Sequence, residues 1–341
     1  MTKMRLNLAK EHLRRLYPGH FTLVLATTVL SLGTFDLGLF FISNLFWYLA
    51  VLFFLVLVVL YLFRLLLNRK GLLLEATDPV LMFNFFCFVT ACNILGIRAA
   101  SGCLFGLSLL LLVTGALSWI FFLFITIAAL IMYNQQPLPK AVNGSWLMLV
   151  VGTQSLVILS TLVLAKIGFK RTFCFLSTSL WLAGIFFYLI IILFILIKFF
   201  FSRINPENMA PSYWVGMGAA SISAVAGMTI LNTGGSISLV IFLRPFIMGM
   251  VLLLWAWATW WIPLLLLIGF WRHVCKRYSF KPDPAFWSIV FPVGMYALAC
   301  LSMGTYFQME WLRNMGRIAV WTGLLAWVAV WLNILFHPGR E

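Results

Sequence analysis

Long apolar runs separated by short polar loops dominate this sequence. A helix needs about 20 residues to cross the ~30 Å hydrocarbon core of a bilayer, and runs of that length recur along the chain. They lack the alternating polar positions of membrane β-strands. We therefore predict an all-α membrane protein with ten spans, at residues 19–37, 45–67, 80–98, 104–133, 145–165, 174–201, 212–233, 239–270, 286–305 and 314–336.

The odd-numbered spans share an opening in which proline or Asn-Gly precedes an aromatic residue. The five openings are Pro18-Gly19-His20-Phe21, Asp78-Pro79 with Phe83, Asn143-Gly144-Ser145-Trp146, Pro211-Ser212-Tyr213-Trp214 and Asp283-Pro284-Ala285-Phe286-Trp287. Proline is favoured in a first helical turn, where its missing N–H would have no partner. The recurrence in alternate spans predicts a helical hairpin repeated five times.

Odd and even spans also differ in their interior residues. The even spans are apolar on all sides and suit lipid contact, whereas the odd spans carry small and polar residues. Small residues at helical spacing allow close packing, which is one explanation. We favour the other, that five small-faced helices surround a conduit, because hydroxyl and amide groups recur on every odd span. The candidate pore-lining residues are Thr27, Ser31, Asn93, Thr153, Gln154, Gly218, Ser221, Gly294 and Tyr296.

The pattern divides the chain into one domain with two short flanks. Residues 17–336 form a single ten-helix domain, 1–16 are a basic amphipathic segment, and 337–341 are a short tail. With the N-terminus in the cytoplasm, sixteen Lys and Arg residues lie inside and seven outside. The positive-inside rule therefore places both termini in the cytoplasm of a multi-pass protein of the cell (inner) membrane.

Composition excludes several classes of protein. Hydrophobic residues make up 64% of the 341 residues and charged residues 9%, which is incompatible with a soluble enzyme. The net charge of +15 is scattered through the loops, so no nucleic-acid partner is expected. The six cysteines lack the spacing of a zinc site.

The eight acidic residues and four histidines all lie at span ends or in loops. Proton relays and cation sites need ionisable groups within the membrane, so a pump or a cation channel is not favoured. No catalytic set, metal cluster or phosphate-binding glycine loop occurs, and we expect neither enzymatic activity nor a cofactor or metal. A neutral conduit in a strongly basic chain suits anions.

One segment of the ninth span resembles a known family. Pro284-Ala-Phe-Trp-Ser-Ile-Val-Phe-Pro-Val-Gly-Met-Tyr296 is similar to the W-x-x-x-F-P segment of the tellurite-resistance/dicarboxylate transporter family. This family includes plant slow anion channels, a bacterial tellurite-resistance channel homologue, and fungal malate and sulfite transporters. Residues 255–274 and Tyr213-Trp214 agree with it, and the resemblance covers roughly residues 15–336.

The resemblance implies five hairpins in pseudo-five-fold order, odd helices lining a central pore, and a trimer of separate pores. It also implies that a phenylalanine of the ninth helix plugs the pore. The family's F-P pair falls on Phe291-Pro292, so Phe291 is the candidate gate, and Pro292 should kink the helix beside it. The alternative is that Phe291 is an ordinary core residue. The third repeat departs from the pattern by opening with Asn-Gly.

These features support a passive anion channel gated by Phe291, with small inorganic or organic anions as permeant species and the bilayer as its environment. The alternative is a carrier or exporter of C4-dicarboxylate, sulfite or tellurite-like oxyanions. A membrane scaffold without transport activity is a third possibility.

Overall fold

The computed structural model describes residues 13, 16–134, 136–168, 170–202, 205–279 and 283–336. Most of the predicted amphipathic segment 1–16 and the whole tail 337–341 lie outside these residues. All regular elements in the described ranges are helices, which agrees with the predicted fold class.

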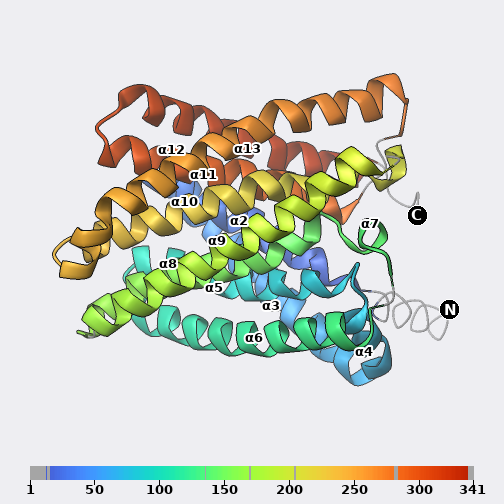
Figure 1. Cartoon of the computed structure of the whole chain (residues 1–341), viewed down its shortest axis with the longest axis horizontal. Coiled ribbons are helices and arrows are strands. Elements are labelled where there is room, and N and C mark those ends of the chain that lie inside the picture. Colours follow the sequence, from blue (N-terminus) through green and yellow to red (C-terminus); the bar gives the residue numbers. More distant parts are fainter. Residues whose placement is uncertain are drawn as a thin grey trace.

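Ten helices of the described chain are long and apolar enough to cross a membrane, as predicted. They pair into five hairpins, each with a first helix that is shorter than the second (Figure 1). The pairs are α2 (Thr22–Asp36) with α3 (Phe40–Leu67), α5 (Phe86–Ser101) with α6 (Phe105–Met132), α8 (Met148–Leu164) with α9 (Lys170–Phe201), α10 (Val215–Gly234) with α11 (Ser238–Phe270), and α12 (Trp287–Tyr306) with α13 (Glu310–Phe336).

The first helix of every hairpin is an inner helix. The buried share of the apolar window is 78–89% for the five inner spans and 17–39% for the outer ones. Each inner helix contacts two other inner helices, so that the five form a closed ring in the order α2, α5, α8, α10 and α12. The outer helices are rich in leucine and phenylalanine and expose them toward lipid. The odd spans of the sequence are therefore the inner helices of the bundle, and the even spans are the outer helices.

A single 3₁₀ turn precedes each inner helix. The turns are η1 (Pro18–Phe21), η2 (Met82–Phe85), η3 (Gly144–Leu147), η6 (Pro211–Trp214) and η8 (Pro284–Phe286). They contact one another in the same cyclic order as the helices. Four of them start at or one residue after the predicted opening, but the second starts at Met82 rather than Pro79. Pro79 belongs to the preceding turn, so it does not open the helix.

Two short helices, α4 (Arg69–Thr77) and α7 (Leu138–Ala141), lie at the end of the bundle where the inner helices begin (Figure 1). Arg64 in the last turn of α3 forms a bidentate ion pair with Glu75 of α4 and is 1% exposed. The predicted span 45–67 includes Arg64, and the structure buries this residue because Glu75 supplies its counter-charge.

The 3₁₀ turns η3 and η6 approach closely enough to require glycine. A Cβ added at Gly144 would lie 2.2 Å from the backbone oxygen of Ser212. Gly144→Ala must push the two turns apart, and we expect it to lower the free energy of unfolding by about 1–3 kcal/mol. Thermal unfolding in detergent measures this. Gly106→Ala in α6 is the control, because nothing lies within 4 Å of its added Cβ. Equal melting temperatures for the two variants would contradict the close approach.

Candidate functional site

A small cavity lies where the five inner helices begin. Each repeat lines it with two residues three positions apart, and Tyr17 completes the lining. The pairs are Gly19 and Thr22, Asn84 and Cys87, Ser145 and Met148, Ser212 and Val215, and Ala285 and Ser288. The same spacing in all five repeats means that equivalent helix faces surround one axis. The cavity volume is about 20 Å³, close to what a single water molecule needs.

The chemistry of this axial cavity is polar and uncharged. Every repeat supplies one neutral polar side chain: Thr22, Asn84, Ser145, Ser212 and Ser288. The Tyr17 hydroxyl donates to Asn84 Oδ1 over 2.8 Å, and burial raises the pKa of Tyr17, so this donor stays protonated. Five helix N-termini, the positive ends of their dipoles, converge on the same point. The cavity is therefore suited to anions rather than cations.

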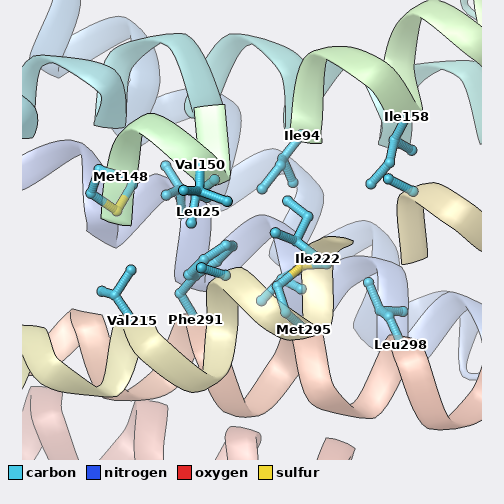
Figure 2. Packing of buried hydrophobic residues seen from close by; sticks show 14 of the residues in the cluster. Leu25, Ile94, Met148, Val150, Ile158, Val215, Ile222, Phe291, Met295 and Leu298 are labelled. Carbon is cyan, nitrogen blue, oxygen red and sulfur yellow. The ribbon is translucent and has the colours of Figure 1, made fainter. Parts of the chain in front are cut away.

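The next layer along the axis is closed by Phe291. Helical spacing predicts that the residues three positions after each cavity residue, which are Leu25, Thr90, Val151, Gly218 and Phe291, form the next layer. Phe291 is 1% exposed and is by far the largest of the five. Its side chain points into the interior of the ring, toward Leu25 of the neighbouring α2 and Val150 of α8 (Figure 2).

Two glycines let the inner helices approach one another beside this layer. A Cβ on Gly218 of α10 would lie 3.0 Å from the Pro292 ring of α12, and one on Gly294 would lie 2.5 Å from Val29 of α2. Pro292 lies inside α12 and has no N–H to donate to the carbonyl of Ser288. Gly218 and Gly294 therefore allow close contact between neighbouring inner helices of the ring.

Beyond Phe291 the axis is filled by apolar side chains. Figure 2 shows Ile94, Ile158, Ile222, Met295 and Leu298 entering the same space from the surrounding helices. Ile94, Ile158, Ile222 and Met295 are at most 3% exposed, and Leu298 is 8% exposed. In this conformation these side chains form an apolar plug within the ring.

Three predicted pore-lining residues instead bind outer helices. Thr27 Oγ1 accepts a hydrogen bond from Trp327 Nε1 of α13 (3.1 Å), and Thr153 Oγ1 accepts one from Trp119 Nε1 of α6 (2.9 Å). Gln154 Nε2 donates to the backbone oxygen of Trp181 in α9 (3.1 Å). These contacts favour a packing role, because buried polar groups in a membrane protein need partners within the protein.

Most of the other candidates also lie at helix interfaces. Ser31 donates to the carbonyl of Ser43 in α3, Asn93 donates to Ser155 of α8, and the Tyr296 hydroxyl bonds Thr259 of α11. Ser221 donates to the carbonyl of Met217 in its own helix. The structure therefore does not bring the nine candidates together in one place.

Arg98 joins the Ser31 cluster near the opposite end of the bundle. Its Nε donates to Ser31 Oγ (3.1 Å) and its Nη2 to Ser43 Oγ and Asn44 Oδ1 (3.0 Å each). The guanidinium lies over the Phe35 ring at 4.6 Å. The predicted span 80–98 ends at Arg98, which is 4% exposed within α5.

A second, larger cavity of about 460 Å³ lies at the ends of α2, α10 and α12. Its polar lining includes Asp36, Asn232, Ser302, Arg313 and Arg317. Glu310 forms ion pairs with both arginines. The bundle therefore has a polar cavity near each end, one where the inner helices begin and one where α2, α10 and α12 end.

Replacing Thr153 separates packing from pore lining. Thr153→Val leaves the Trp119 N–H without its acceptor. We therefore expect the free energy of unfolding in detergent to fall by about 1 kcal/mol. The ratio of nitrate to chloride permeability should not change, because the side chain faces α6. Thr114→Val is the control, since Thr114 is half-buried on α6 and donates to the carbonyl of Leu110 in its own helix. A changed permeability ratio with unchanged stability would indicate that Thr153 lines the pore.

Comparison with known proteins assigns the family. The model of the SLAC1, voltage-dependent anion channel, family matches residues 15–335. An uncharacterised transporter of Methanocaldococcus jannaschii is 24% identical over 86% of this chain and 85% of its own length. An uncharacterised membrane protein of Mycobacterium tuberculosis is 29% identical over 39% of this chain and 68% of its own length. This multi-pass membrane protein belongs to the voltage-dependent anion channel family, as the Phe291-Pro292 segment predicts.

Proposed function

We propose that the protein is a passive anion channel whose central pore is closed by Phe291. The observation that carries this proposal is the position of Phe291. Its ring lies one helical turn beyond the polar axial cavity, on the face that all five inner helices share, and is 1% exposed. A ring at that point blocks the axis sterically and keeps water out of it.

Selectivity for anions follows from the axial cavity. An anion there would meet hydroxyl and amide groups and the positive ends of five helix dipoles. Within the described part of the chain, neither a carboxylate nor a cationic side chain lines the cavity. Such sites attract an anion without holding it strongly, which conduction requires. A carrier of dicarboxylates or oxyanions would need a stronger site, and no described side chain along the axis provides one.

Pro292 makes the part of α12 that carries the gate easier to displace. Because Pro292 cannot donate to the carbonyl of Ser288, α12 lacks one backbone hydrogen bond in the turn that carries Phe291. Gly218, on the neighbouring helix α10, faces Pro292 without a side chain of its own. Opening then consists of a displacement of the Phe291 ring out of the axis, with small changes in the surrounding helices.

Two further features of the proposal rest on family resemblance and charge. Three copies assemble as a trimer, each with its own pore. Both termini face the cytoplasm of the cell membrane, which places the axial cavity on the cytoplasmic side and the 460 Å³ cavity outside.

Phe291→Ala tests the gate. Removing the ring should raise the anion current through protein reconstituted in planar bilayers by at least tenfold, because the largest group in the axial layer is lost. The variant also creates a cavity that costs about 3–5 kcal/mol of stability. The current must therefore be normalised to folded protein, measured by size-exclusion chromatography.

Phe86→Ala is the matched control. Phe86 is fully buried but packs against Phe122 and beside Gly152, away from the axis. It should suffer a similar loss of stability without a gain of current. An unchanged current in folded Phe291→Ala protein, or an equal gain in both variants, would remove Phe291 from the mechanism.

A further inference from the structure

An apolar groove of about 530 Å³ lies between α3, α4 and α6, separate from the central axis. Its floor includes Phe21 of η1 and Phe88 of α5, and its walls include Tyr61, Leu72 and Phe122. Phe21 and Phe88 are neighbours, with ring centroids 5.3 Å apart. The groove therefore reaches the points where two inner helices begin.

The wall formed by α4 is held firmly in place. The Arg64–Glu75 ion pair links α4 to α3, and the Asn68 side chain accepts a hydrogen bond from the Gly71 N–H at the start of α4. A buried cation without Glu75 would be strongly unfavourable, so α4 cannot swing away at low cost. The groove is consequently a preformed feature of the fold.

The groove opens on the lipid-facing side of the bundle. Its walls α3 and α6 are outer helices, with 17% and 22% of their apolar windows buried. An apolar cavity exposed to bilayer hydrocarbon offers no hydrogen bonds to water, and an acyl chain fills it favourably. The surroundings of the groove thus identify an alkyl chain as its occupant.

Two cations mark the rim of the groove. Arg69 lines it and Lys70 follows in sequence, and both are exposed at the start of α4. Across the described ranges, no carboxylate forms an ion pair with either of them. Cations at the edge of a membrane-facing pocket bind lipid headgroups that carry negative charge.

We propose that this groove is a binding site for an anionic phospholipid, with one acyl chain in the groove and the phosphate headgroup at Arg69 and Lys70. The proposal does not depend on anion conduction or on Phe291. Because the acyl chain would pack against Phe21 and Phe88, a bound lipid stabilises the starts of α2 and α5.

Native mass spectrometry of delipidated protein tests the site. The probes are phosphatidylglycerol and phosphatidylcholine with identical acyl chains, added at equal concentration. We expect the protein to retain phosphatidylglycerol preferentially, and each of Arg69→Gln and Lys70→Gln to weaken that binding about fivefold. Lys140→Gln is the control, because Lys140 is an exposed lysine of α7 at the same end of the bundle (Figure 1). It should bind like the wild type.

A second variant tests the groove itself. Ala76→Trp places a large side chain in the lining and should reduce binding of both lipids, while circular dichroism verifies that the protein remains folded. Equal retention of the two lipids by the wild type would overturn the proposal, as would full retention by Ala76→Trp. A lipid-free oligomer that Ala76→Trp dissociates would show that a second copy of the chain fills the groove, which also contradicts the proposal.

Discussion

The contact ring among the five 3₁₀ turns is the constraint on which the rest of the structure depends. These turns fix where each inner helix begins, and therefore which of its faces meets the axis. Once the turns are in register, residues at equivalent positions meet as layers. The polar layer at Thr22 and Ser288 and the layer that contains Phe291 both follow from this register. Gly144 shows how tightly the register is set, because its neighbour leaves no room for a side chain.

The hydrogen bonds between inner and outer helices are the second constraint on the fold. Lipid offers no partners to hydroxyl, amide or indole groups, so these groups must pair within the bundle. Thr27 with Trp327 and Thr153 with Trp119 satisfy this requirement and at the same time attach an outer helix to the ring. The ring can then remain apolar along its axis without leaving these polar residues unsatisfied.

Several levels of this structure were predictable from sequence. Hydrophobic run length identifies the ten spans, and composition separates inner from outer helices, because lipid-facing helices need no small residues. The segment 284–296, together with residues 255–274 and Tyr213-Trp214, was sufficient to predict the family. The axial residues Ser145, Ser212 and Ser288 were missed, although their offset from the repeated openings contained the necessary signal.

Other features depend on partners that are distant in the sequence. Thr27 and Trp327 lie at opposite ends of the chain, so the direction of the Thr27 side chain could not be deduced from its own helix. The burial of Arg64 and Arg98 was not predicted from the sequence, because arginines near the ends of spans normally reach the membrane interface. Their burial depends on Glu75 in one case and on Ser31, Ser43 and Asn44 in the other. Hydropathy does not reveal such pairings.

The reversal potential of the current tests the central claim of a neutral, anion-selective axis most directly. Purified protein in a planar bilayer would be recorded under a tenfold gradient of potassium chloride. The arrangement of five helix N-termini around an uncharged polar cavity predicts a reversal potential close to the chloride equilibrium potential. A reversal potential close to that of potassium would contradict the account.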